Sequence, residues 1–155
     1  MKILFIRHSL AVEREKFDGH DFERPLEEKG VKRAKKFFKH ISKIYPEIDC
    51  IITSKAMRAK QTAEILRGFY NSAVYEETPL LYPGATFNDL KQAIKNKEGI
   101  IAIIGHEPDL SEFIKEMMYA PNLKLKLTKP SLAETEDGVL KSLFQYKHFK
   151  DEHAK

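Results

Sequence analysis

Apolar residues fall into short runs that alternate with longer segments in which apolar and charged residues share a helical spacing. The runs at residues 3–7, 48–53 and 99–105 lack polar alternation, which is typical of strands buried on both faces of a sheet. In residues 27–44 the apolar positions step by three and four while lysines fill the opposite face, which predicts an amphipathic helix. Alternation of strand and helix over most of the chain predicts an α/β protein with a largely parallel sheet.

The rest of the chain continues this pattern. Three further helices are predicted, over residues 55–69, 87–97 and 108–118, the first with Ser54 as its N-cap. Four further strands are predicted, at residues 73–76, 123–128, 132–135 and 139–146, the last two joined by the turn residues 136–138. The residues after Tyr146 are expected to fray. The expected fold is a three-layer α/β/α sandwich with a mostly parallel sheet and an antiparallel C-terminal edge.

Composition narrows the class of protein. The length of 155 residues and the 42% of hydrophobic residues suit one packed domain over residues 1–155. The net charge of +4 is too small to indicate a nucleic-acid-binding protein. No apolar run approaches the roughly 20 residues of a membrane span, and the first run is too short for a signal peptide. A cytoplasmic protein without a membrane partner is therefore expected.

Polar residues capable of chemistry follow three of the predicted strands. Arg7 and His8 end the first strand, Arg58 lies in the first helical turn after the second buried strand, and His106 follows the third. In an open α/β sheet, ligands bind outside the carboxyl ends of the strands, where helix N-termini also favour anions. Two arginines and two histidines are therefore expected to form an anion pocket, with a phosphoryl dianion as the expected ligand.

The two histidines make this pocket a candidate enzyme site. A neutral histidine can attack phosphorus and carry the phosphoryl group, while a second, protonated histidine and two arginines stabilise its oxygens. This scheme needs no metal ion and no other cofactor. The single cysteine, Cys50, excludes an intramolecular disulfide and a cysteine-rich zinc site. A metal site built from His8, His106 and Cys50 is disfavoured, because two arginines would repel the cation and Cys50 lies in a buried strand.

Four segments, in this order along the chain, resemble the signature of the histidine phosphatase superfamily. Segment 6–11 (IRHSLA) resembles its Arg-His-Gly type of tripeptide after the first strand, and segment 24–30 (RPLEEKG) resembles R-P-L-T-x-x-G. Segment 53–63 (TSKAMRAKQTA) resembles S-P-x-x-R-A-x-Q-T-A, and segment 105–111 (GHEPDLS) resembles G-H-x-P-x-L-S. The length and the R-P-L segment are most similar to the small SixA-type phosphohistidine phosphatases.

This resemblance implies roles for the pocket residues. His8 would be the nucleophile that becomes phosphorylated, and Arg7, Arg58 and His106 would complete the phosphate pocket. Ser9 stands where glycine or alanine is usual, and its hydroxyl is expected to narrow the approach of the substrate.

A proton donor to the leaving group is also implied, since larger family members place an acidic residue before the third helix. The candidates are Glu76, Glu77 and, in the long loop after the first strand, Asp18. Glu107, at a predicted helix start, is expected to be a cap instead. The loop at residues 18–23 is the one segment expected to be able to fold over the pocket.

Chain length bears on the substrate. Predicted elements use most of residues 59–105, which leaves no room for the insertions that cap the site in sugar-phosphate mutases and bisphosphatases of the superfamily. An open site and the resemblance imply a metal-independent phosphatase that acts on a phosphoprotein, with phosphohistidine as the expected substrate. Two alternatives stay open. One is a phosphomonoesterase acting on a small phosphate ester, and the other is a non-catalytic module that binds phosphate or a phosphoprotein.

Overall fold

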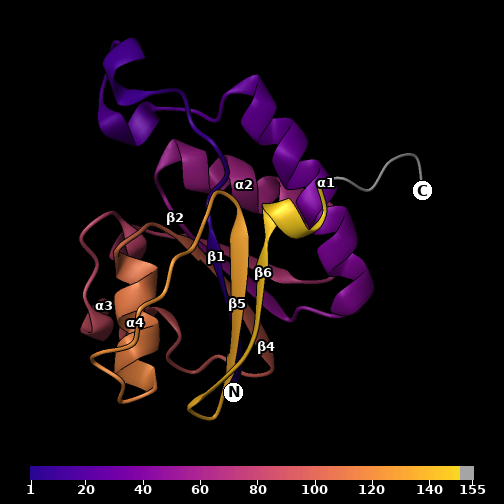
Figure 1. Cartoon of the computed structure of the whole chain (residues 1–155), viewed down its shortest axis with the longest axis vertical. Helices are drawn as coiled ribbons and strands as arrows, with labels where there is room; N and C mark the ends of the chain where they lie inside the picture. The colour runs from indigo at the N-terminus through magenta and orange to yellow at the C-terminus, as the bar shows by residue number, and fades with distance from the viewer. Residues whose placement is uncertain (151–155) are drawn as a thin grey trace.

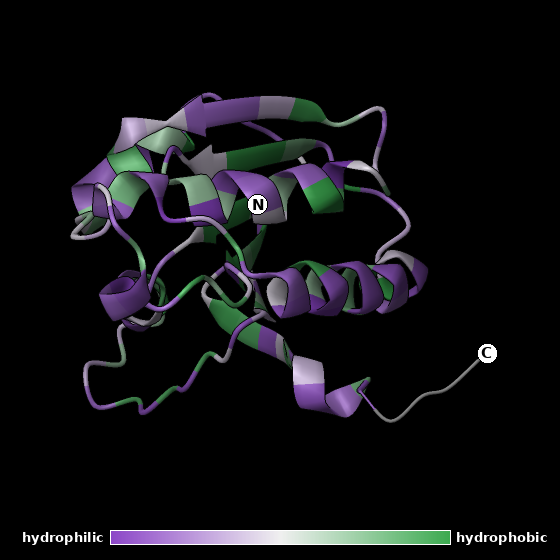
Figure 2. Ribbon diagram, turned by 90° about the horizontal axis from the view of Figure 1, so that it is seen from above, coloured by the Kyte–Doolittle hydropathy of each residue, from purple (hydrophilic) through white to green (hydrophobic). Residues whose placement is uncertain are grey.

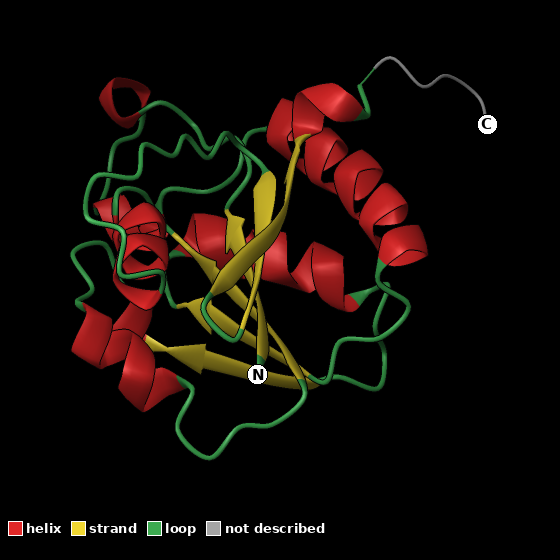
Figure 3. Ribbon diagram, turned by 60° about the horizontal axis from the view of Figure 1, so that its bottom comes forward, coloured by secondary structure: helices red, strands yellow, loops and turns green. Residues whose placement is uncertain are grey.

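The computed structural model describes residues 1–150, which form a six-stranded sheet with helices on both faces (Figures 1 and 3). The strands are β1 (Lys2–Arg7), β2 (Cys50–Ser54), β3 (Val74–Thr78), β4 (Ile100–Gly105), β5 (Ser131–Glu136) and β6 (Val139–Gln145). The helices are α1 (Glu28–Ile44), α2 (Met57–Arg67), α3 (Phe87–Ala93) and α4 (Asp109–Met117). Short 3-10 helices are η1 (Arg14–Lys16), η2 (Asp21–Glu23), η3 (Pro79–Leu81) and η4 (Tyr146–His148). Within the described residues, no helix is long and apolar enough to cross a membrane.

The sheet has the strand order β3-β2-β4-β1-β5-β6. Strands β1, β4, β2 and β3 pair in parallel, whereas β5 pairs antiparallel with β1 and β6 antiparallel with β5. This arrangement confirms the predicted sandwich with its antiparallel C-terminal edge.

The central strands lack polar alternation because each supplies side chains to two apolar clusters. Leu4 and Ile6 of β1 pack with residues of α1 and α2, whereas Ile3 and Phe5 pack with residues of α3 and α4. The ring of Phe5 lies 6.4 Å from that of Phe113 in α4, measured between centroids. Figure 2 shows the result as hydrophobic strands between helices whose outer faces are hydrophilic.

The start of α2 differs from the prediction. Ser54 is the last residue of β2 and does not cap the helix, whose N-cap is Ala56. The Ser54 hydroxyl oxygen instead accepts a hydrogen bond from the backbone N–H of Ala56, at 3.2 Å, and contacts the ring of His106. The strand therefore extends one residue further than predicted and carries this hydroxyl into the polar end of the sheet.

Two other predicted elements are shorter or missing. Helix α3 ends at Ala93 rather than residue 97, and Asn96 then adopts a left-handed φ of 63° that no helix can contain. Residues 123–128 form no strand. Their leucines pack on the α3 and α4 cluster, with Leu127 buried, while the Leu127 carbonyl accepts a hydrogen bond from the Arg7 side chain at 2.6 Å. Side-chain packing, not strand pairing, explains the alternating pattern there.

The chain beyond β6 is packed up to residue 150. Phe149, which follows η4, stacks on His40 of α1 with ring centroids 4.6 Å apart and lies 5.6 Å from Phe37. The expectation of a frayed end is therefore wrong for residues 147–150, and the remainder of that expectation, residues 151–155, lies outside the described residues.

Helix α1 starts directly against the loop that follows β1. The Glu27 N–H donates to the Leu10 carbonyl at 3.1 Å, and the Ser9 hydroxyl donates to the Gly30 carbonyl at 2.7 Å. A Cβ at Gly30 would overlap the carbonyl oxygen of Leu10, so this approach requires glycine. The contact holds the backbone immediately after His8.

We expect Gly30→Ala to lower the free energy of unfolding by about 1–3 kcal/mol, because the added methyl group forces α1 or the loop to shift. In an ordinary helix the same exchange stabilises by about 1 kcal/mol, so the sign of the change is diagnostic. Denaturant unfolding measures it, with Lys29→Ala at the exposed neighbouring position as a control that stays within about 0.5 kcal/mol of the parent. An alanine variant at position 30 as stable as the parent would contradict this account.

Candidate active site

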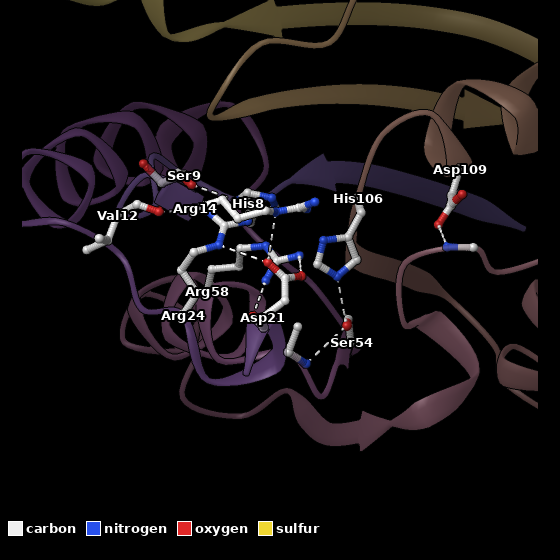
Figure 4. Close-up of polar contacts among 12 residues, drawn as sticks. His8, Ser9, Val12, Arg14, Asp21, Arg24, Ser54, Arg58, His106 and Asp109 are labelled. Carbon is white, nitrogen blue, oxygen red and sulfur yellow. Dashed lines mark hydrogen bonds and ion pairs between the residues drawn. The ribbon is translucent and has the colours of Figure 1, made fainter. Parts of the chain in front are cut away.

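Two histidines meet because β1 and β4 are parallel neighbours that end at the same level. Arg7, the last residue of β1, pairs with Gly105, the last residue of β4, so His8 and His106 follow side by side. The His8 N–H donates to the Gly105 carbonyl at 3.2 Å. The two imidazole centroids lie 5.2 Å apart, with their planes inclined by 58° (Figure 4). Both residues are buried, with 5% and 4% of their surface exposed.

His8 presents a free ring nitrogen. Its Nδ1 lies 2.7 Å from the carbonyl oxygen of Ser9. Because a carbonyl oxygen only accepts hydrogen bonds, Nδ1 carries the proton and Nε2 keeps its lone pair. Burial, reinforced by repulsion from His106, holds the pKa of His8 well below 6.5, so the ring is neutral at neutral pH.

His106 is positioned by Ser54. Its Nε2 lies 2.9 Å from the Ser54 hydroxyl. Burial, followed by the positive charge of Arg58, lowers the pKa of His106 to about 3. Its Nδ1 is buried without a hydrogen-bond partner in the described chain and lies on the side of the ring that faces His8 (Figure 4).

Two guanidinium groups complete the set that the sequence brings to this edge of the sheet. Arg58, in the first turn of α2, is 3% exposed, and Arg7 is partly buried. Burial lowers the pKa of both. Each has a buried Nε without a partner in the described chain. Together with Nδ1 of His106 they are three buried nitrogens whose hydrogen bonds a phosphoryl group can supply.

An acidic residue that the sequence analysis did not single out lies in the same site. The Asp21 carboxylate, in η2, accepts hydrogen bonds from Arg58 at 3.1 Å and Arg24 at 3.0 Å, and Arg14 lies 3.4 Å away (Figure 4). Burial alone would raise the pKa of Asp21, but the hydrogen bond from Arg24 and the charges of Arg58, Arg24 and Arg14 hold it below its usual value. The loop at residues 18–23 thus reaches the pocket through Asp21. In the sequence, the only indication of this contact was that Asp21 precedes Arg24 by three residues, a spacing at which two opposite charges can pair.

None of the three predicted proton donors is held at the two histidines. Glu76 pairs with Lys97 at 3.5 Å, Glu77 accepts a hydrogen bond from the Tyr75 hydroxyl at 3.0 Å, and Asp18 is exposed. Within residues 1–150, none of these carboxylates forms a hydrogen bond or ion pair with the two histidines or with their neighbouring arginines.

Glu107 and Ser9, which directly follow His106 and His8, had predicted roles of their own, of which the first is confirmed and the second is wrong. The Glu107 side chain accepts from the Ser111 N–H at 2.8 Å, so it caps the first turn of α4 as expected. The Ser9 hydroxyl is buried against α1 and donates to Gly30, so the expectation that it narrows the substrate's approach is wrong.

Positive charge extends beyond the predicted residues. Burial, and then the charges of Arg7, Arg24 and Arg58, lower the pKa of Lys129. Sequence reasoning assigned no site role to Lys129 or Arg24, although Arg24 opens the R-P-L segment. The site is therefore a cluster of cations around two neutral imidazoles, with Asp21 as the carboxylate among them.

The described part of the chain contains no cluster of three or more histidine, cysteine, aspartate or glutamate residues that could hold a metal ion. Cys50 starts β2, whereas Ser54, at the other end of that strand, contacts His106. A metal site that joins the thiol to the two histidines is therefore contradicted.

Comparison with known protein families identifies the class of protein to which this site belongs. Residues 3–81 match the model of the histidine phosphatase superfamily, branch 1, which covers half of the chain. The chain therefore belongs to this superfamily, and the resemblance drawn from the four motifs is confirmed. It is accordingly a phosphatase.

Individual proteins resemble this chain in structure or in sequence. A structure of the protein histidine phosphatase SixA complexed with tungstate is 22% identical, with a TM-score of 0.84 over 97% of this chain and 100% of that chain. A putative phosphohistidine phosphatase SixA from Agrobacterium tumefaciens is 21% identical, with a TM-score of 0.74 over 86% of this chain and 89% of that one. These two likenesses establish the fold. An uncharacterized protein of Picosynechococcus sp. (strain ATCC 27264 / PCC 7002 / PR-6) is 29% identical over 123 residues, 77% of this chain and 74% of its own.

The buried neutral histidines predict how stability depends on pH. Their pKa values are depressed by folding, so their contribution is complete above the unfolded value of about 6.5 and is lost as pH falls below it. Between pH 7 and pH 5 the parent is expected to lose about 1–2 kcal/mol more unfolding free energy than His106→Gln, which lacks one of the two groups. Urea unfolding at both pH values measures this, with His20→Gln as an exposed control. Equal losses in parent and His106→Gln would refute the assignment.

Proposed function

We propose that this phosphatase works without a metal ion, through a phosphohistidine intermediate on His8, and that it dephosphorylates phosphohistidine on a protein. The observation that carries the proposal is the free Nε2 of a neutral His8 beside two arginines and a second histidine. Membership of the histidine phosphatase superfamily supports it.

In the first step the Nε2 lone pair of His8 attacks phosphorus, and the new N–P bond forms as the bond to the leaving group breaks. Catalysis of phosphoryl transfer consists mainly of positioning and charge stabilisation, for which the forked donors of Arg7 and Arg58 are suited. His106 is neutral in the empty site. A bound dianion raises its pKa, which enables the ring to take up a proton and donate from Nδ1 to a phosphoryl oxygen.

Asp21 is the carboxyl group that this site offers as proton donor. Arginines keep it ionised in the empty site. A phosphoryl dianion bound to Arg58 repels this carboxylate and raises its pKa, so that it takes up a proton and passes it to the leaving atom. In the second step, water gives a proton to the Asp21 carboxylate and attacks phosphorus. The N–P bond then breaks, its electron pair returns to Nε2 of His8, and inorganic phosphate is formed.

The lack of an inserted segment between Arg58 and His106 supports a protein substrate. Helix α2, β3, η3, α3 and β4 account for most of the chain between Arg58 and His106, so no inserted segment is available to cover the site. A histidine on a protein surface can then reach the buried nucleophile. Its imidazole, once protonated, also leaves more readily than an alkoxide, which lessens the demand on the proton donor.

His8→Ala is expected to lower turnover of a phosphohistidine peptide and of 4-nitrophenyl phosphate by on the order of 10³-fold or more, because the nucleophile is lost. Mass spectrometry of the parent, quenched during turnover, should show one phosphoryl group on His8. Treatment with EDTA should leave the rate unchanged.

His20→Ala, an exposed histidine in the same half of the chain, serves as the control and should keep both activities. Full activity of His8→Ala would disprove the proposed intermediate. Turnover of 4-nitrophenyl phosphate without turnover of any phosphohistidine peptide would favour the small-molecule phosphomonoesterase. Phosphate binding without turnover would favour a non-catalytic module.

Asp21→Asn tests the proton donor. It should lower kcat for phenyl phosphate, whose leaving group needs a proton, by about 100-fold or more, with a smaller effect on 4-nitrophenyl phosphate. KM should fall for both substrates, since the variant removes a negative charge that Arg58 otherwise binds. Asp18→Asn, which alters an exposed carboxylate of the preceding loop, should change neither constant. A loss in kcat that is the same for both leaving groups would argue against proton donation by Asp21.

A further inference from the structure

A groove of about 370 Å³ beside the site is lined by five cations and by no carboxylate. These cations are Arg7, Arg33, Lys129, Lys147 and Lys150, and we call the feature the basic groove. The whole chain has a net charge of only +4. Five positive charges around one groove are therefore a pronounced local concentration, which attracts anions.

Four segments that are distant in sequence build the basic groove: the end of β1 with the loop that follows it, α1, the loop that leads into β5, and the end of β6 with η4 and the residues after it. The Arg33 guanidinium lies 4.8 Å from the centroid of the Tyr146 ring, which ties η4 to α1. The Gln145 side chain donates to the Lys126 carbonyl at 3.0 Å, and the Tyr146 N–H donates to the Pro130 carbonyl at 3.2 Å. Figure 1 shows η4, in yellow, against α1. These contacts give the groove walls a defined shape.

The cations of the basic groove are not neutralised from within the described chain. Among residues 1–150, no carboxylate forms an ion pair with Arg33, Lys147 or Lys150, nor with Arg7 or Lys129. Like charges held together repel one another, so an anionic ligand in the groove relieves this repulsion as well as forming its own ion pairs.

We infer that the basic groove binds an acidic segment of the phosphoprotein substrate, next to the phosphorylated histidine. The inference rests on the proposed function. Arg7 lines the groove and also stands in the phosphate site, so a substrate chain whose phosphohistidine faces His8 passes directly into the groove. Aspartate and glutamate side chains on that flank then pair with Lys147 and Lys150, which are exposed.

The groove is better suited to a peptide than to an inorganic anion. Leu10 and the ring of Tyr146 lie among its cations. They offer apolar contact that the side chains and backbone of a peptide can use and that a free phosphate ion cannot. A small phosphate ester is held at the histidines and arginines of the site and needs none of this additional surface.

The test compares peptides of one length, each phosphorylated on a single histidine and carrying three aspartates, three serines or three lysines on one flank. The parent is compared with the double variant Lys147→Glu/Lys150→Glu and with Lys43→Glu/Lys95→Glu, which reverses two exposed charges outside the groove. The parent and the control variant should show a KM about tenfold lower for the aspartate peptide than for the serine peptide, a preference that declines with added salt. The groove variant should lose this preference while its turnover of 4-nitrophenyl phosphate stays unchanged.

Binding of the unphosphorylated aspartate peptide, measured by fluorescence anisotropy, tests the groove without the chemical step. A protein that binds this peptide through Lys147 and Lys150 but hydrolyses no phosphohistidine would retain the groove assignment and refute the proposed function. Equal KM values and affinities for the three peptides, or equal losses in both double variants, would overturn the inference. Binding of RNA or of anionic phospholipid vesicles through these lysines, without binding of the acidic peptide, would overturn it as well.

Discussion

The parallel pairing of β1 with β4 is the constraint on which the site depends. Since Arg7 lies opposite Gly105, both strands end at one level and the next residues, His8 and His106, emerge side by side. The register is held from both faces of the sheet, because alternate β1 side chains pack into separate apolar clusters. A slip by one residue would exchange those faces and bury the wrong side chains. The hydrophobic core therefore determines the geometry of the polar site at the ends of these strands.

The protonation states of the two histidines and of Asp21 follow from the burial of several positive charges in one site. Two guanidinium groups lie beside two imidazoles, and burial together with the charges of Arg7 and Arg58 lowers the pKa of both rings and keeps them neutral. The nucleophile proposed for this site must be neutral, and the same environment that favours an anionic ligand keeps His8 deprotonated at Nε2. Asp21 is held in this positive field and stays ionised for the same reason.

Most of the fold and four of the site residues could be predicted from the sequence, because they depend on local patterns of hydrophobic and turn residues. The three buried strands, helix α1 and the Asp137–Gly138 hairpin follow from periodicity and turn chemistry, and the topology of parallel strands brings His8, Arg58 and His106 to one edge. The position of Asp21 did not follow, because it is set by Arg58, a residue far away in the chain. Residues 123–128 have the alternating pattern of a strand, but their leucines pack on the α3 and α4 cluster without pairing to the sheet. Residues 147–150 are held by contacts of Phe149 with α1, which no local pattern predicts. The basic groove was missed for the same reason, since its cations come from four separate segments.

The ion pair between Asp21 and Arg58 bears on how the cycle ends. If phosphate leaves Arg58 as the proposed function requires, a buried guanidinium would otherwise be left with its charge uncompensated, and such a charge holds tightly to whatever anion is present. The carboxylate of η2 is the group that takes the departing ion's place. In the proposed mechanism, product release is therefore an exchange of one anion for another and not the exposure of a bare charge, which weakens the hold of Arg58 on inorganic phosphate.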